Sequence, residues 1–237
     1  MQPSTLAVSL RFLHISSMLT LIQFPWSPFC ITIRHILTRH RIPFRLHNIA
    51  YHDRAPIIKA TKGQGHTVPC LIDGRHAICD LTDFGQEVAH YVDRRYRLNL
   101  FPKNLDGLQL ILSRYIENDL ESVGFKVNDT YVIPTRPLIE RTMLIRHKER
   151  KFGRGCLREW TTHRRYLCTQ FVELLKPIDS MLADSPFLLT DRPLFVDYNL
   201  YGVLGNYLFN GKTKLPSLKH LRRWYQMMDT RNYPDLS

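Results

Sequence analysis

The sequence lacks any apolar run of about 18 residues, the length that a membrane-spanning helix needs. Cysteine is scarce, with five in 237 residues, and no two cysteines stand in the Cys-x-x-Cys spacing of zinc sites and dithiol redox motifs. An odd number of cysteines without a clear secretory signal is typical of reduced thiols in the cytoplasm. These absences predict a cytoplasmic protein that neither crosses a membrane nor binds a metal.

Acidic residues are also few: 21 Asp and Glu stand against 33 Lys and Arg, which gives a net charge of +12. Such an excess would suit nucleic acid or another anionic partner. The basic residues are densest between Arg141 and Arg165, but Glu140, Glu149 and Glu159 stand among them. This mixture is typical of a solvated helix surface, so we do not expect a nucleic-acid partner.

The most informative stretch runs from Leu19 to Cys30 and predicts a short apolar strand that turns directly into a helix. Ser27 stands at the N-cap position, and Pro28 follows at the first helical position. A hydroxyl and, three residues later, a thiol therefore lie at the positive end of a helix dipole, which stabilises a thiolate or another anion. The plain alternative is that Ser27 only caps the helix and Cys30 only fills space in the core.

The residues that follow predict an α/β unit. After the first helix come an alternating strand, a short helix, a hairpin about an Asp-Gly turn and a further helix. A single mixed sheet accommodates this order of elements. The segments concerned are Phe44–Ile49, Ala55–Thr61, Thr67–Cys79 and Asp83–Arg94.

The second half predicts an all-helical bundle, because strand signals fade and apolar residues recur at helical spacing. We place a first domain at residues 18–97, a linker at 98–105 and the helical domain at 106–237. Residues 1–17 form an extension, either a targeting segment or the product of an upstream start codon. Helices are expected over 105–120, 137–148, 157–182, 193–204 and 216–228, with an irregular segment at Gly124–Thr135.

Four segments in this order and spacing resemble the glutathione transferase family, closest to bacterial members that begin Phe-Pro-Trp-Ser-Pro-Phe-Cys. The resemblance covers about Met18 to Tyr225. It implies a thioredoxin-like α/β N-terminal domain followed by an all-α C-terminal helical bundle, and a homodimer. The segments are Ser27-Pro28-Phe29-Cys30, Val68-Pro69-Cys70-Leu71, Asp73-Gly74 and Val88-Ala89-His90-Tyr91-Val92-Asp93.

The resemblance also implies a site. Glutathione, as co-substrate, would lie across the carboxyl ends of the first domain's strands, and Ser27 would donate a hydrogen bond to its sulfur. Trp26 belongs to the same turn, and Val68-Pro69 matches the family's cis-proline, where the preceding residue's backbone pairs with glutathione. A small apolar electrophile would pack against the helical domain.

The chain departs from the family at the γ-glutamyl end of this site. The family's acidic residue and serine fall on Phe84 and Gly85, which bind no amino-acid head group through a side chain. Asp80, Thr82 and Asp83 are the candidates to replace them. Loss of two polar contacts would cost about 2–4 kcal/mol of binding free energy.

A second departure lies in the helical domain. Leu194 stands where the family has a Ser or Thr that caps a helix, three residues before a buried Asp. That Asp is Asp197. We expect it to cap backbone N–H groups without a reciprocal partner, in a folding role.

Three functions remain open. The first is a transferase in which Ser27 activates the thiolate, the second a glutathione thiol transferase that uses Cys30, and the third a non-catalytic binder of ligands or partners. An anion site formed by Cys156, Trp160 and nearby basic residues is a further candidate. Aromatic candidates for the electrophile pocket are Trp26, Tyr115, Phe125 and Tyr131.

Overall fold

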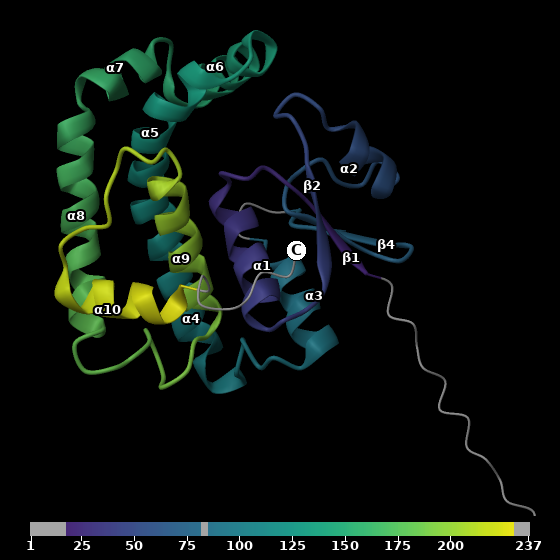
Figure 1. Cartoon of the computed structure of the whole chain (residues 1–237), viewed down its shortest axis with the longest axis vertical. Coiled ribbons are helices and arrows are strands. Elements are labelled where there is room, and N and C mark those ends of the chain that lie inside the picture. The colour runs from purple at the N-terminus through teal and green to yellow at the C-terminus, as the bar shows by residue number, and fades with distance from the viewer. Residues whose placement is uncertain (1–17, 82–84, 230–237) are drawn as a thin grey trace, which may run out of the picture.

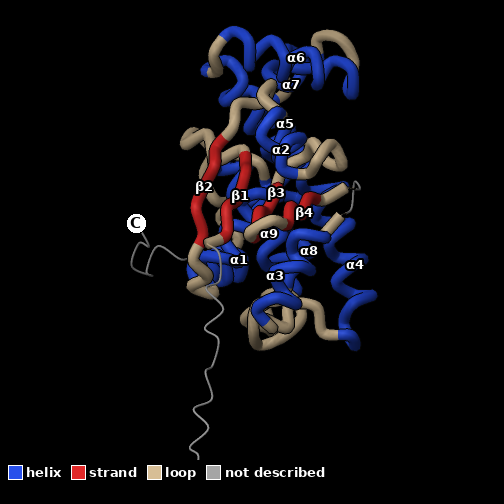
Figure 2. Tube along the Cα trace, turned by 90° about the vertical axis from the view of Figure 1, so that its right-hand side faces the viewer, coloured by secondary structure: helices blue, strands red, loops and turns tan. Residues whose placement is uncertain are grey.

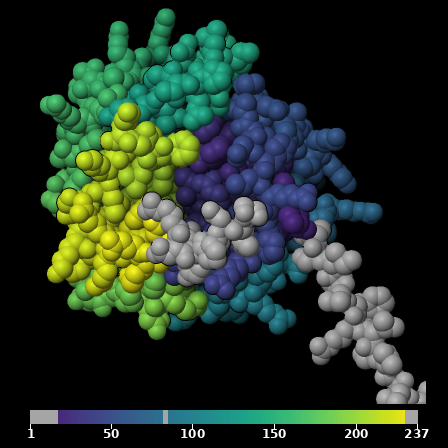
Figure 3. All heavy atoms as spheres, in the orientation of Figure 1, coloured from purple at the N-terminus to yellow at the C-terminus, as the bar shows by residue number. Residues whose placement is uncertain are grey.

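The computed structural model describes residues 18–81 and 85–229. A sheet-containing N-terminal part packs beside a helical C-terminal part (Figure 1). The two parts meet along a seam on the face shown in Figure 3. This arrangement confirms the predicted fold, a thioredoxin-like domain followed by a mostly helical one.

The N-terminal part carries one four-stranded mixed sheet in the order β2-β1-β3-β4 (Figure 2). β1 is parallel to β2 and antiparallel to β3, and β3 and β4 form the predicted hairpin. The elements are β1 Leu19–Gln23, α1 Pro28–Arg39, β2 Phe44–Asn48, α2 Ala55–Ala60, β3 Cys70–Asp73, β4 His76–Cys79 and α3 Glu87–Tyr96. The predicted start of the last helix, Asp83, lies outside the described residues.

The central strands are buried on both faces, because side chains alternate along a strand. Leu21 and its register partner Leu71 belong to the large core that includes α1 and α3. Ile22 and its partner Cys70 belong to a smaller cluster with Ile57 of α2. The sheet therefore separates two apolar layers.

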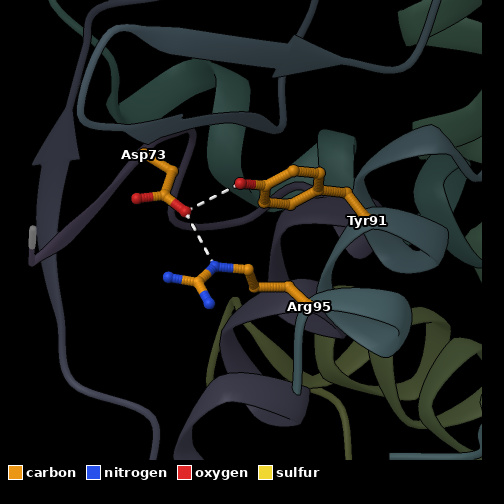
Figure 4. A network of polar contacts seen from close by, with 3 residues as sticks. All are labelled: Asp73, Tyr91 and Arg95. Atoms are coloured by element: carbon orange, nitrogen blue, oxygen red, sulfur yellow. Dashed lines mark hydrogen bonds and ion pairs between the residues drawn. The ribbon is translucent and has the colours of Figure 1, made fainter. Parts of the chain in front are cut away.

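A carboxylate ties the hairpin to α3 (Figure 4). Asp73 Oδ2 accepts a hydrogen bond of 2.7 Å from the Tyr91 hydroxyl and lies 3.4 Å from Arg95 Nε. Burial, together with the hydrogen bond to this carboxylate, raises the pKa of Tyr91 to about 12. The hydroxyl therefore stays protonated and keeps donating at every physiological pH.

The C-terminal part is helical, as predicted. A short 3₁₀ turn, η1 Lys103–Leu105, precedes it, and α6 and α7 lie together at one end of the molecule (Figures 1 and 2). The elements are α4 Asp106–Tyr115, η2 Ile116–Leu120, α5 Glu121–Val132, η3 Ile133–Thr135, α6 Leu138–Phe152, α7 Cys156–Thr162, α8 Arg164–Met181, α9 Phe195–Leu208 and α10 Lys219–Met228.

The expectation of an irregular segment at Gly124–Thr135 is wrong. The chain continues from α4 through the π-helical turn η2 into α5 and the 3₁₀ turn η3. Gly124 does not break the helix; a Cβ at this position would lie 2.9 Å from Phe171 Cε2 of α8. The glycine permits two helices to approach closely, which the local sequence does not reveal.

The single helix expected over 157–182 is also wrong, because it bends at His163 into α7 and α8. The Glu159 carbonyl lies 2.9 Å from the His163 backbone nitrogen and 3.0 Å from its ring Nδ1. The His163 ring thus competes with the His163 backbone N–H for the Glu159 carbonyl. Pro177, by contrast, lies inside α8 without ending it.

Asp197 stabilises the start of α9. As predicted, its carboxylate caps backbone N–H groups without a hydroxyl at position 194 to reciprocate. Its carboxylate accepts hydrogen bonds from Leu194 N at 2.9 Å, Leu188 N at 3.0 Å and Trp224 Nε1 at 2.8 Å. Asp197 and Leu194 are both fully buried. The leucine that replaces the capping hydroxyl contributes to the core instead.

Helices α1 and α9 pack with little space between their backbones. A Cβ on Gly202 of α9 would overlap the Thr32 hydroxyl and the Pro28 carbonyl of α1. The Thr32 hydroxyl lies 3.0 Å from the Pro28 carbonyl and 3.3 Å from the Tyr198 carbonyl of α9. This contact fixes the N-terminal turn of α1 against the helical part.

We predict that Gly202→Ala destabilises the protein by about 1–3 kcal/mol or more, because a methyl group must displace backbone. Gly107→Ala is the matched control, since this exposed helical glycine has open space around it. It should stabilise by about 0.5–1 kcal/mol through helix propensity. Urea unfolding measures both changes; equal effects at the two positions would contradict the packing argument.

Candidate functional site

The candidate site is built on the turn between β1 and α1. Ser27 N donates to the Phe24 carbonyl at 3.1 Å, and the Ser27 carbonyl accepts from Ile31 N at 2.9 Å. Ser27 occupies the predicted N-cap position, but among the described residues its hydroxyl makes no capping bond to the helix. The helix backbone therefore does not hold this hydroxyl, and a role for Ser27 in a site stays a prediction.

Cys30 lies beneath this turn and is fully buried. Burial raises the pKa of its thiol to about 12, although a hydrogen bond from Ser27 and the positive charge of Arg34 oppose the shift. A buried, protonated thiol is a poor nucleophile. Its position therefore favours a core role over thiol transfer.

The Val68–Pro69 peptide bond is cis, in agreement with the resemblance. Pro69 immediately precedes β3, whose first residue, Cys70, is the register partner of Ile22 in β1. Val68 packs in the same apolar cluster as Phe24. The sheet therefore brings the Val68–Pro69 backbone to the carboxyl end of β1, beside the Ser27 turn.

Asp80 immediately follows β4 and links this region to α3. Its Oδ1 accepts a hydrogen bond of 2.9 Å from Val88 N, and its backbone carbonyl accepts one of 2.7 Å from the Thr67 hydroxyl. Burial, with Glu87 nearby, raises the pKa of the Asp80 carboxyl to about 7. Thr82, Asp83 and Phe84 lie outside the described residues, and Gly85 lines a small recess with Asp80.

Trp26 lies at the seam between the two parts. Its ring stacks on Phe24, with centroids 5.3 Å apart, and the Arg136 guanidinium lies 4.1 Å above it. Its carbonyl accepts a hydrogen bond of 2.7 Å from Asn206 Nδ2 of α9. Both parts of the chain thus hold the turn in place.

A pocket of about 310 Å³ opens next to the first turn of α1. Its walls combine three aromatic rings with carboxylate, amide, imidazole and ammonium groups. Of the four predicted aromatic residues, Phe125 lines this pocket, whereas the Tyr115 hydroxyl donates to the Leu174 carbonyl. The lining residues are Phe29, Glu117, Asn118, Glu121, Phe125, His147, Lys148, Lys151 and Phe152.

Two carboxyl groups in this pocket were missed in the sequence. Burial raises the pKa of Glu121 to about 7 against the opposing charge of Lys148, and burial also raises the pKa of Glu117. Asn199 Nδ2 donates to Glu117 Oε1 at 2.8 Å, and Lys148 Nζ lies 2.9 Å from Asp129 Oδ2. Glu117 lies in η2 and Glu121 begins α5, so the continuous run from η2 into α5 brings both carboxyl groups to the pocket.

The predicted anion site at Cys156 and Trp160 is wrong. Cys156 is 2% exposed and Trp160 is 6% exposed. The indole packs edge-on against Phe125 and Phe152. Both residues therefore belong to the core.

Within the described residues, no group of three His, Cys, Asp or Glu side chains is placed to hold a metal ion. Over the same part of the chain, none of the helices combines the length and the apolar character needed to span a membrane.

The raised pKa of Asp80 predicts a pH-dependent stability. A carboxyl whose pKa lies above its unfolded value of 3.8 binds more protons in the folded state, so its contribution is lost as pH rises through about 7. Between the unfolded pKa of 3.8 and the folded pKa of about 7, we expect the free energy of unfolding to fall less with rising pH in Asp80→Asn than in the unmodified chain. Urea titrations across the window measure this; parallel curves would contradict the assignment.

Sequence models of the glutathione S-transferase N-terminal domain and C-terminal domain match residues 21–99 and 145–226, respectively. No curated protein matches the sequence. Solved structures do share the fold, and each match covers 90% of this chain.

One is glutathione transferase GSTFuA3 from Phanerochaete chrysosporium, with 16% identity, 96% of that chain covered and a TM-score of 0.76. Another is CsGST63524 of Ceriporiopsis subvermispora in complex with glutathione, with 15% identity, 98% covered and a TM-score of 0.75. A third is glutaredoxin 2 from Salmonella typhimurium in complex with glutathione, with 19% identity, 94% covered and a TM-score of 0.69. Since the two domain models together span more than half of the sequence, the chain belongs to the glutathione S-transferase family.

Proposed function

We propose that the protein is a glutathione transferase that uses the Ser27 hydroxyl to hold glutathione as its thiolate. The observation that carries the proposal is the position of this hydroxyl. It lies at the N-terminus of α1, makes no capping bond within the described chain, and is next to the cis Val68–Pro69 bond. Serine and cis-proline together are what the family resemblance requires of such a site.

The physical role of Ser27 is to lower the pKa of the bound thiol. A donated hydrogen bond stabilises the thiolate relative to the thiol, and the partial positive charge at the helix N-terminus acts in the same direction. The thiolate is the nucleophile. A hydrogen bond with the Ser27 hydroxyl already acts to lower the pKa of the Cys30 thiol, against the effect of burial. A glutathione sulfur at the mouth of the turn would compete for this hydroxyl.

Val68 would pair with the cysteinyl backbone of glutathione, and Trp26 would flank it. Asp80 and Asp83 would bind the γ-glutamyl amino group. Val88 N occupies Asp80 Oδ1, so the amino group would bind at Oδ2, beside Glu87. Two of the similar structures are complexes with glutathione, which supports glutathione as the co-substrate.

The electrophile would enter the pocket beside Phe29. Phe29, Phe125 and Phe152 favour a small molecule with an apolar, preferably aromatic, body. We further propose a cytoplasmic homodimer. Leu108 and Ile111 of α4, which are 53% and 69% exposed, offer apolar surface for self-association.

One observation favours a second candidate, a non-catalytic binding protein. Asp80 is already used to start α3, so the γ-glutamyl group has a weaker anchor than the family provides. Thiol transfer through Cys30 has no comparable support, because its thiol is buried.

We predict that Ser27→Ala lowers kcat/KM for conjugation of glutathione to an activated aryl halide by about 100-fold, as loss of a donor to a developing anion does elsewhere. Cys30→Ala should retain the activity or raise it, since it frees the Ser27 hydroxyl from an internal partner. Steady-state rates of both variants measure this.

Unchanged rates in Ser27→Ala would contradict the proposal. Loss of thiol transfer in Cys30→Ala alone would instead support a glutathione thiol transferase that uses Cys30. Glutathione binding without turnover in the unmodified chain would identify a binding protein.

A further inference from the structure

Two of the five cysteines face each other across the β hairpin. Cys70 is the first residue of β3 and Cys79 the last residue of β4, and the two are register partners in the antiparallel pair. Both belong to the same apolar cluster, so both side chains lie on the α2 face of the sheet. All five cysteines are described, and all are free thiols.

This placement meets the geometric needs of a disulfide. Directly opposed residues of an antiparallel pair have Cα atoms about 4.5–5.5 Å apart. Disulfides span Cα separations of about 4.4–6.8 Å. Cys70 and Cys79 are register partners in one apolar cluster, so their side chains stand opposite each other on the same face of the sheet. Bond formation therefore requires little movement of the backbone.

The surroundings restrict what can reach the pair. Cys70 is fully buried and Cys79 is 6% exposed. Gly65 lies directly over Cys79: a Cβ built on it would be 3.4 Å from the sulfur. Only a small oxidant would fit past this loop, which disfavours a bulky disulfide such as oxidised glutathione.

We propose that Cys70 and Cys79 are a redox pair, which a hydroperoxide converts to an intramolecular disulfide across β3 and β4. In the first step the Cys70 thiolate attacks the peroxide, giving a sulfenic acid and, from hydrogen peroxide, one water. In the second step the Cys79 sulfur attacks the Cys70 sulfur, forming the S–S bond and releasing a second water. Two thiols are oxidised and one peroxide is reduced.

The direction of the chemistry follows from the thiol–thiol hydrogen bond. The hydrogen bond between the two thiols lowers the pKa of Cys70, and the same bond together with burial raises the pKa of Cys79. The thiolate is the reactive form of a cysteine. Cys70 is thus the attacking residue and Cys79 the resolving one.

The pair lies beyond the proposed transferase activity and does not depend on it. The bond would join the residue that follows Pro69 to the residue that precedes Asp80. It would tie together the two segments that border the candidate site. The hairpin would then exist in a reduced and a cross-linked form.

The chain offers a direct test, because Arg75 lies between the two cysteines. The full-length reduced protein is treated with hydrogen peroxide, alkylated under denaturing conditions and digested with trypsin. We expect peptides 63–75 and 76–94 to appear as one cross-linked species, two hydrogens lighter than their sum and separated by dithiothreitol. Recovery of the two peptides separately, or linkage of either one to another cysteine, would overturn the proposal.

Single substitutions test which cysteine attacks the peroxide and which one resolves the sulfenic acid. Cys79→Ser should abolish the cross-link and leave Cys70 to proceed to sulfinic acid, since no thiol resolves its sulfenic acid. Cys168→Ser, which alters a cysteine outside the pair, should form the cross-link as the unmodified chain does. Circular dichroism checks that both variants fold. An unoxidised Cys70 in folded Cys79→Ser would contradict its assignment as the attacking residue.

Discussion

The close contact between α1 and α9 is the constraint on which the candidate site depends. Gly202 lets the backbone of α9 reach Thr32 and the Pro28 carbonyl, in the first turns of α1. Asn206, one turn further along α9, holds the Trp26 carbonyl. The helical part therefore fixes the turn that carries Ser27. Without this contact, the hydroxyl and the neighbouring cis-proline would have no fixed relation to the pocket on the helical side.

The protein as a whole is strongly basic, with a net charge of +12, but several of its buried ionisable groups are carboxyls. Burial raises the pKa of Asp80 and Glu121 to about 7 and that of Asp197 to about 6. Near neutral pH such groups exchange between donor and acceptor forms. Of these three groups Glu121 lines the pocket, which is therefore better suited to hydrogen bonding with a polar substituent than a purely apolar site would be.

Much of the fold was predictable because its signals are local. Pro28 after Ser27 marks the start of α1, and Asp73-Gly74 marks the hairpin. The cis bond before Pro69 followed only from the resemblance, since nothing local distinguishes it from a trans proline. Gly124 misled because its role depends on Phe171, a tertiary contact. His163 misled because its propensity does not reveal that its ring binds the Glu159 carbonyl.

A search for Cys-x-x-Cys spacing does not detect the Cys70–Cys79 pair. The position of the hairpin turn does predict it. A two-residue turn that pairs Asp73 with His76 also pairs Cys70 with Cys79, three positions further from the turn on each strand. Glu117 and Glu121 had no such signal. Their place in the pocket depends on how the predicted helix continues through η2 into α5, a continuation that Gly124 concealed.

Calorimetric titration of the full-length protein with reduced glutathione tests the central claim most directly, because the claim is that the Ser27 turn and the cis-proline segment form a glutathione site. The account predicts saturable binding with a dissociation constant below about 1 mM, or roughly −4 kcal/mol. Absence of heat up to about ten times that concentration would contradict it. The family fold would stand, and the chain would be a binding module for another ligand.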